Sequence, residues 1–295
     1  MATSMGEARW ADVAGVRTRY FREGAGTPVV LLHGGSFGAR DAVCTAWDWA
    51  PVFGRLAEGF DVVAPDRLGQ GFTGQPLRDA DYTMDASVQH TAALLKSLGK
   101  GPYHLVGHSR GGYVAARLAL EYPELARTCT IISSGTLAPG IGRNHIVLRN
   151  LPLPLFSRES QRWALERYSF DPKIVDEPWL DDGVAAAKTE GHKLAVRKMQ
   201  EEGLERSQFT PQLGRQRGET RRWILDRGMP CPTLLVWGLN DPTADLDNGK
   251  FLLEMLMRKQ RQSEFRLFNR AGHFVFREQP AAFARMFQHY FRQHA

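Results

Sequence analysis

The 295-residue chain is 43% hydrophobic, which suffices for the core of one large domain or two. Its net charge of +6 comes from basic residues interleaved with acidic ones, without a basic block or zinc-finger spacing. Nucleic-acid binding is therefore not predicted, whereas an acidic small-molecule substrate stays open. Three widely spaced cysteines form no disulfide or metal pattern, and residues 1–12 lack the apolar core of a signal peptide.

No apolar run approaches membrane-spanning length, and no dinucleotide fingerprint or metal-ligand cluster occurs. We therefore expect a cytoplasmic protein that has no metal ion, organic cofactor or membrane segment. The sequence leaves open whether it forms a homo-oligomer.

The first half of the chain alternates apolar strands with helices. An antiparallel hairpin is predicted at residues 9–12 and 16–21. Continuous apolar runs predict buried strands at residues 27–32, 60–64, 103–106 and 127–133. Helical spacing follows at residues 83–98, where Thr83 is the expected N-cap and Gly99 the stop. Strands that alternate with helices predict a parallel, doubly wound sheet.

This alternation ends near Pro139. Residues 139–228 contain several further prolines and no clear buried strand, but they have helical patches at 157–168 and 182–203. We interpret them as a helical lid inserted between two parts of an α/β core, residues 1–138 and 229–295. In the second part, strands are predicted at residues 232–237 and 264–268, and helices at 249–257 and 283–291.

The segment Gly107-His108-Ser109-Arg110-Gly111 matches the G-x-S-x-G nucleophile elbow. An apolar strand precedes it and a helix-forming run follows, as that motif requires. The turn would hold Ser109 above the sheet, in front of the free N–H groups of a helix. The alternative is an ordinary glycine-rich turn between a strand and a helix.

An acid and a base complete the predicted constellation. Ser109, Asp241 and His273 each follow a predicted strand, in the chain order Ser…Asp…His. A serine hydroxyl needs a base, which His273 can supply, and Asp241 would orient the imidazole. Other aspartates, Asp245 and Asp247, lie close enough to compete for that role. Other histidines are also available, namely His33, His90, His145 and His192, and we expect His108 to pack under the turn.

A second glycine cluster, His33–Gly38, directly follows the strand at 27–32. We expect the backbone N–H groups of Gly35 and Arg110 to form an oxyanion hole. The alternative is a flexible turn. Candidate substrate contacts are Gly34, Ser36, Phe37, Trp163 and Phe274, although lid aromatics also serve as lid core.

Together these motifs resemble the α/β-hydrolase superfamily, which implies a mostly parallel sheet flanked by helices. Within it, HGGSFGA (33–39), YSFDPKIVDEPWL (168–180) and FNRAGHF (268–274) are similar to meta-cleavage product hydrolases. The resemblance implies attack on a ketone-type carbonyl and cleavage of a carbon–carbon bond, helped by ketonisation of a dienol.

The chain departs from that family's pattern at three places. His108 stands where the family often has Asn, and Phe274 stands where it usually has Trp. Where the family places a lid arginine, this chain reads Asp181-Asp182-Gly183-Val184. The prediction is thus a serine hydrolase acting on a small, partly apolar carbonyl compound, through either a C–C bond or a carboxylic ester. The alternatives are a ligand-binding protein and a cofactor-free oxygenase in which His273 abstracts a substrate proton.

Overall fold

The computed structural model describes residues 5–140, 142–260 and 262–295. Within them one eight-stranded sheet has the order β1-β2-β4-β3-β5-β6-β7-β8. Its strands are β1 (Arg9–Val13), β2 (Val16–Glu23), β3 (Pro28–Leu32), β4 (Asp61–Pro65), β5 (Tyr103–His108), β6 (Ala126–Ile132), β7 (Thr233–Gly238) and β8 (Ser263–Phe268). β1 and β2 pair antiparallel, as do β2 and β4, and the remaining pairs are parallel. The predicted fold class and hairpin are confirmed.

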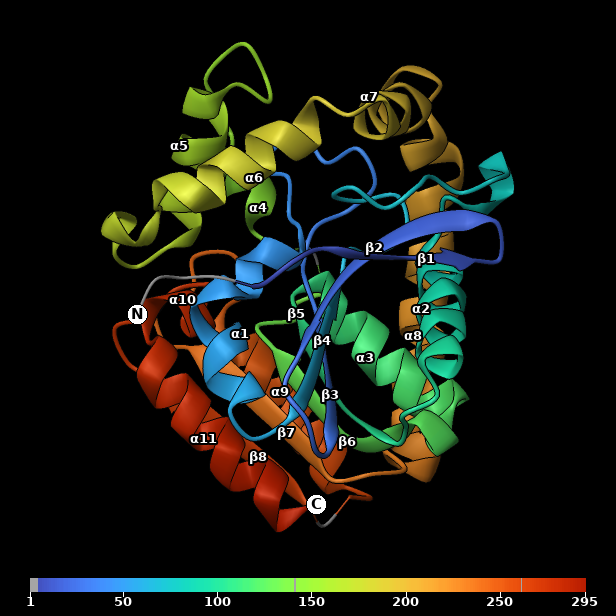
Figure 1. The fold of residues 1–295 in the computed structure, drawn as a ribbon, viewed down its shortest axis with the longest axis vertical. Coiled ribbons are helices and arrows are strands. Elements are labelled where there is room, and N and C mark those ends of the chain that lie inside the picture. The colour runs from blue at the N-terminus through green and yellow to red at the C-terminus, as the bar shows by residue number, and fades with distance from the viewer. Residues whose placement is uncertain (1–4, 141, 261) are drawn as a thin grey trace.

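Alternate residues of the central strands supply two separate cores. In β3, Val30 and Leu32 belong to one apolar cluster, whereas Val29 and Leu31 belong to the other. The first cluster is completed by α2 (Met84–Leu98), α3 (Arg110–Glu121), α8 (Thr210–Arg227) and α9 (Leu246–Met257). The second is completed by α1 (Ala50–Ala57), α10 (Val275–Glu278) and α11 (Pro280–Gln293), on the opposite side of the sheet (Figure 1). The sheet is therefore covered on both faces.

Local signals account for both ends of α2. Thr83 caps α2 by accepting from the Ala86 N–H at 3.1 Å, and Gly99 ends that helix with φ +64°. The sequence analysis missed α1, which has Pro51 in its first turn. Short 3-10 turns at Ala46–Trp49, Asp79–Asp81, Pro123–Leu125 and Pro172–Ile174 join other elements.

The segment between β6 and β7 is helical. It contains α4 (Asn144–Val147), α5 (Arg158–Tyr168), α6 (Glu177–Ala187), α7 (Glu190–Val196), two π-helical segments (Arg197–Glu201 and Glu205–Phe209) and α8. Helices α4–α7 lie together beyond one end of the sheet, whereas α8 runs back along the core (Figure 1), where Arg117 of α3 donates to Glu219 and Thr220. In this article the lid means residues 139–228, the boundaries predicted above, and these boundaries stay a prediction.

The single helix predicted for residues 182–203 is wrong. The chain instead forms the end of α6, then α7 and the first π-helical segment. Thr189 has extended backbone and caps α7 by accepting from the His192 N–H at 3.1 Å, so it starts a new helix. Pro178 and the capping Asp176 start α6 several residues before the predicted position.

The lid is joined to the core by polar contacts. The Trp179 indole donates to the buried Asp48 carboxylate at 2.8 Å. Arg277 stacks on the Trp179 ring at 3.8 Å and pairs with Asp176 at 3.0 Å. We call Asp48, Asp176, Trp179 and Arg277 the seam cluster.

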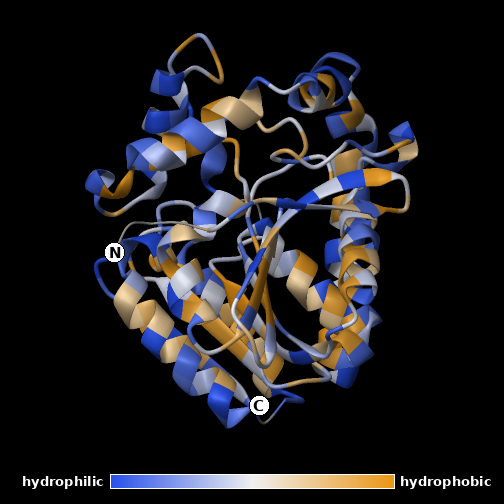
Figure 2. Ribbon diagram, in the orientation of Figure 1, coloured by the Kyte–Doolittle hydropathy of each residue, from blue (hydrophilic) through white to orange (hydrophobic). Residues whose placement is uncertain are grey.

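Hydropathy follows this division (Figure 2). The central strands are strongly apolar, and the lid helices carry long hydrophilic stretches. Along the described residues, no helix combines the length and apolar character that a membrane span requires.

Candidate active site

The turn between β5 and α3 has the backbone of a nucleophile elbow. Ser109 has φ +53° and ψ −121°, a conformation that non-glycine residues rarely adopt. A Cβ on Gly107 would lie 2.0 Å from the Gly111 carbonyl oxygen, and one on Gly111 would lie 2.2 Å from the Leu32 carbonyl oxygen. The glycines are therefore needed because strand, helix and β3 approach closely. Ser109 itself remains partly exposed.

The structure brings the predicted acid and base together. The His273 Nδ1 atom lies 2.7 Å from Asp241 Oδ2. The other oxygen of Asp241 accepts from the N–H groups of Thr243 and Ala244, both at 2.9 Å, and from the Thr243 hydroxyl at 3.0 Å. These contacts fix the carboxylate, so it can orient the imidazole with Nδ1 as the hydrogen-bond donor.

The competing aspartates lie elsewhere. Asp245 forms an ion pair with Arg143 at 2.9 Å, and Asp247 pairs with Lys250 on an exposed surface. Neither is paired with His273.

The loop that carries His273 is held from several sides. The His273 N–H donates to the Tyr168 carbonyl at 2.9 Å, and the Tyr168 ring stacks on the imidazole with the ring centres 5.2 Å apart. Glu278 accepts from the Gly272 N–H at 2.7 Å and from the Phe170 N–H at 3.1 Å. The lid therefore contributes directly to the position of the candidate base.

His108 connects this loop with the elbow. Its Nε2 donates to the His273 carbonyl at 2.9 Å, and the two imidazole centres lie 4.5 Å apart. Burial keeps the pKa of His108 well below its ordinary value, so the ring is neutral. His108 therefore packs under the turn, as expected, and places Ser109 beside the His273 loop.

The glycine turn after β3 lies against the candidate nucleophile. A Cβ on Gly34 would come within 3.2 Å of the Ser109 Cβ, and Gly35 has φ +81°. Arg67 Nη2 donates to the carbonyls of Gly34 and Gly35, each at 2.7 Å. Among the described residues, neither the Gly35 N–H nor the Arg110 N–H has a hydrogen-bond acceptor. Both donors are therefore free for an oxyanion.

The predicted substrate contacts differ in their surroundings. Phe37 is 2% exposed and packs on Tyr82 and Phe209, with ring centres 5.3 and 6.1 Å apart. Phe274 is 1% exposed and packs against His108, Tyr168, Trp179 and His273. Both rings thus support the site as core residues.

Trp163 lies on α5 and is stacked by Arg167 at 4.9 Å, whereas Ser36 and Gly34 lie in the turn after β3. The substrate-contact roles of these residues and of the two phenylalanines stay predictions.

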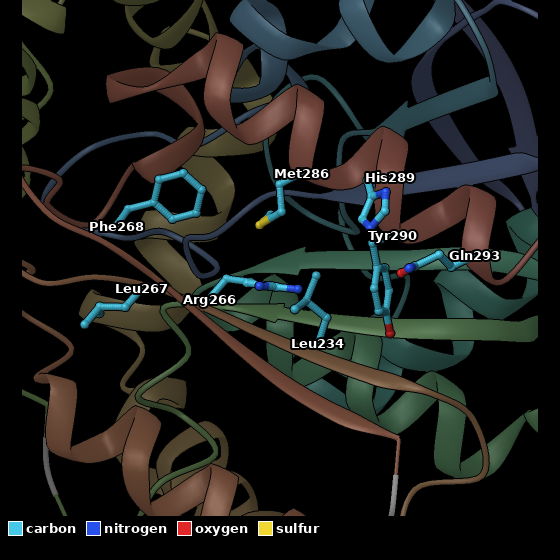
Figure 3. Close-up of a pocket in the computed structure, with 8 residues that line it drawn as sticks. All are labelled: Leu234, Arg266, Leu267, Phe268, Met286, His289, Tyr290 and Gln293. Carbon is cyan, nitrogen blue, oxygen red and sulfur yellow. The ribbon is translucent and has the colours of Figure 1, made fainter.

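A cavity of about 670 Å³ opens between the lid and the segment after β3. It is lined by Arg40, Leu155, Phe156, Val196, Met199, Gln200, Glu201, Gly203, Glu205 and Arg206. Both π-helical segments contribute to it, and such segments frequently occur at functional sites. None of the predicted site residues lines this cavity. The same holds for a smaller cavity of about 400 Å³ between β8 and α11 (Figure 3).

Sequence reasoning missed four residues that hold the site in place: Arg67, Tyr168, Thr243 and Glu278. Thr243 had a local signal, because it lies two residues after the acid in an Asp-Pro-Thr turn. The other three act through contacts between distant segments, which no local pattern reports.

Comparison with known proteins agrees with this geometry. Residues 29–286 match the alpha/beta hydrolase family. The chain therefore belongs to the alpha/beta hydrolase family and is an α/β-hydrolase, as the motifs predicted.

Its relatives include enzymes of the meta-cleavage class. The chain is 27% identical over 288 residues to 2-hydroxy-6-oxo-6-(2'-aminophenyl)hexa-2,4-dienoic acid hydrolase of Metapseudomonas resinovorans, covering 94% of this chain and 88% of that protein. It is 29% identical over 274 residues to 2-hydroxymuconate semialdehyde hydrolase of Pseudomonas sp. strain CF600, covering 92% and 89%. The fold matches a meta-cleavage product hydrolase from Pseudomonas fluorescens IP01 with a TM-score of 0.79 and 24% identity, over 97% of this chain and 98% of that one. The predicted likeness to this class is confirmed.

Proposed function

We propose that the protein is a serine hydrolase in which Ser109 is the nucleophile, His273 the general base and Asp241 the residue that orients the base. The observation that carries this proposal is the 2.7 Å contact between His273 Nδ1 and Asp241 Oδ2, on the loop that His108 links to the strained Ser109 turn. Each of the three residues follows a parallel strand of the sheet, where α/β folds place their ligands.

The chemistry follows from these positions. His273 Nε2 takes the Ser109 proton as the Ser109 oxygen attacks the substrate carbonyl carbon. The negative charge that develops on the carbonyl oxygen would be held by the N–H groups of Gly35 and Arg110, each donor contributing about 3 kcal/mol. Collapse of the adduct breaks the bond to the leaving group, which receives the proton from His273. Water then hydrolyses the acyl-enzyme by the same route.

We propose that the bond broken is the carbon–carbon bond of a ring-fission-type dienoate. The support is the family likeness, because relatives over more than nine-tenths of the chain are named as hydrolases of such compounds. In this branch the dienol ketonises before Ser109 attacks, so that the leaving carbon departs as a stabilised carbanion.

A carboxylic ester is the second candidate substrate. One feature of the lid favours an ester over a dienoate, namely the missing arginine. The family's lid arginine has no counterpart at Asp181 and Asp182. Asp181 pairs with Arg158 at 2.7 Å, and Asp182 lies 3.3 Å from Arg19. The two candidates share the same nucleophile and differ only in the leaving group.

The test compares both substrate types on one enzyme preparation. Loss of the yellow absorbance of 2-hydroxymuconate semialdehyde and of 2-hydroxy-6-oxo-6-phenylhexa-2,4-dienoate reports C–C cleavage. Release of 4-nitrophenolate from 4-nitrophenyl butyrate reports ester cleavage. We expect turnover of at least one dienoate, faster than that of the ester and lost in Ser109→Ala.

Faster ester turnover would select the second candidate. Turnover of neither type by folded protein, or oxygen uptake that survives Ser109→Ala, would contradict the hydrolase proposal.

A further inference from the structure

The side chain that follows the candidate nucleophile carries an unpaired positive charge. The Arg110 guanidinium packs on the Phe209 ring, 5.3 Å from its centre. Within the described part of the chain it has no hydrogen-bond acceptor and no carboxylate at ion-pair distance. Three other largely buried arginines differ, since Arg19, Arg117 and Arg277 each hold a carboxylate.

The acidic groups near Arg110 are engaged elsewhere. Asp41 accepts a hydrogen bond from the Tyr168 hydroxyl at 2.6 Å. Glu205, on the rim of the lid cavity, accepts from Gln200 at 2.9 Å. Burial lowers the pKa of Arg110, and the negative charge of Asp41 opposes this decrease. The two side chains therefore attract each other electrostatically without forming an ion pair. Neither acid neutralises the guanidinium by direct contact.

A second cation adds to this charge. Arg67 is 1% exposed and bonds the neutral oxygens of Gly34, Gly35 and Gln70, and it has no carboxylate partner among the described residues. Burial lowers the pKa of Arg67, and Arg110 lowers it further because the two like charges repel. The turn that is proposed to hold the oxyanion therefore contacts the Arg67 guanidinium directly, and Arg110 contributes a second guanidinium near Arg67. Among the described residues, no carboxylate pairs with either group.

We propose that the Arg110 side chain binds a carboxylate of the substrate, so that the enzyme prefers carbonyl compounds that carry an anionic group a short chain away from the reacting carbon. A guanidinium fork pairs with a carboxylate through two parallel hydrogen bonds, and a partly buried cation gains most from such a partner. The backbone N–H of the same residue is directed to the oxyanion, so Arg110 sets the spacing between the two groups. This inference rests on the proposed function, because it assigns Ser109 as the nucleophile.

The test uses two esters of equal length that differ in charge, 4-nitrophenyl hydrogen glutarate and 4-nitrophenyl valerate. The measured quantity is the ratio of kcat/KM for the anionic ester to kcat/KM for the neutral ester. We expect Arg110→Met to lower this ratio by about 10- to 100-fold, as expected for loss of a charge-assisted pair. Arg110→Lys is expected to restore part of the ratio. Arg285→Met, which removes an exposed charge from α11, is expected to leave it unchanged.

An unchanged ratio in Arg110→Met, or an equal decrease in Arg285→Met, would overturn the proposal. A binding measurement keeps it independent of turnover. In a Ser109→Ala background, calorimetry with monoethyl glutarate is expected to show binding that is lost on adding Arg110→Met. If the wild type hydrolyses neither ester, this titration still decides the role of Arg110, and the dienoate assay with Ser109→Ala decides the Ser109 proposal separately.

Discussion

The carboxyl edge of the sheet and the lid are built in different ways. At the sheet edge, Ser109, Asp241 and His273 each follow a strand directly, and their backbones or side chains are fixed by several hydrogen bonds. The lid consists of helices α4 to α8, with two π-helical segments between α7 and α8, and it borders the 670 Å³ cavity. Short local motifs therefore position the proposed catalytic residues, whereas packing between distant segments holds the lid.

The two regions meet at the seam cluster and at Tyr168. Tyr168 lies on the lid, yet its carbonyl and ring both hold the loop of His273. Substitutions at the sheet edge should therefore change turnover without changing stability, whereas substitutions at the seam should change stability first.

The largest expected effect is at the nucleophile. Ser109→Ala should lower kcat by at least about 10³-fold, because the remaining groups bind the substrate but cannot form the acyl-enzyme. Its thermal midpoint should stay close to that of the wild type, since alanine fits the same turn. Steady-state kinetics and a melting curve on the same sample check both statements. Turnover by Ser109→Ala near the wild-type rate would show that Ser109 is not the nucleophile.

The next largest effect on turnover is expected at Asp241. Asp241→Asn should lower kcat by about 10³- to 10⁴-fold with a smaller change in KM, because an amide favours the wrong imidazole tautomer. The matched control is Asp245→Asn, which removes a charge from the same loop but not from His273. A similar loss in both variants would assign the effect to the loop and not to the carboxylate.

At the seam, Arg277→Met should lower the free energy of unfolding by about 2–4 kcal/mol. The substitution leaves the Asp176 carboxylate and the carbonyls of Trp47 and Asp48 without their donor. Denaturant titration measures the loss, and Arg285→Met on the exposed face of α11 is the control. A decrease in kcat that, expressed as a free energy, exceeds the loss in the free energy of unfolding would contradict the proposed division between the two regions.

The smallest effect concerns pH. Burial raises the pKa of Asp48 to about 7, above its value of about 3.9 in an unfolded chain. Between these values the folded state keeps a proton that the unfolded state has lost, so the free energy of unfolding decreases as pH rises and stays lower above pH 7. Asp48→Asn keeps an acceptor for the Trp179 indole but cannot ionise. It should flatten this dependence and exceed wild-type stability at pH 8 by about 1–4 kcal/mol.

Urea titrations at several pH values test this expectation. The exposed Asp247→Asn should follow the wild-type curve. A difference in the free energy of unfolding between the wild type and Asp48→Asn that stays constant from pH 5 to pH 8 would show that Asp48 is already ionised in the fold at pH 5.

Much of the sheet and of the site could be predicted because the signals are local. Buried parallel strands such as β3 and β5 appear as continuous apolar runs, and the elbow requires glycines at fixed spacing around Ser109. Asp241 could be chosen because it follows such a strand, β7, whereas His273 was chosen from the strand β8 and from Gly272 directly before it.

The rest depended on contacts that sequence periodicity does not record. Thr189 divides a continuous helical pattern into two helices, because its side chain caps the second one. Tyr168 holds the His273 loop from a distant part of the chain, and Glu278 joins this loop to Phe170. Phe37 and Phe274 pack as core residues, although they flank the candidate catalytic motifs. In each case tertiary packing, not local preference, determines the role.

The most direct test of the account is labelling of the wild type and of Ser109→Ala with a fluorophosphonate probe, read by intact mass. We expect a single adduct on the wild type, none on Ser109→Ala, and strongly slowed labelling of Asp241→Asn, because only a serine activated by His273 reacts quickly. Absence of an adduct on folded wild-type protein, or an adduct that persists in Ser109→Ala, would contradict the central claim that Ser109 is the activated nucleophile.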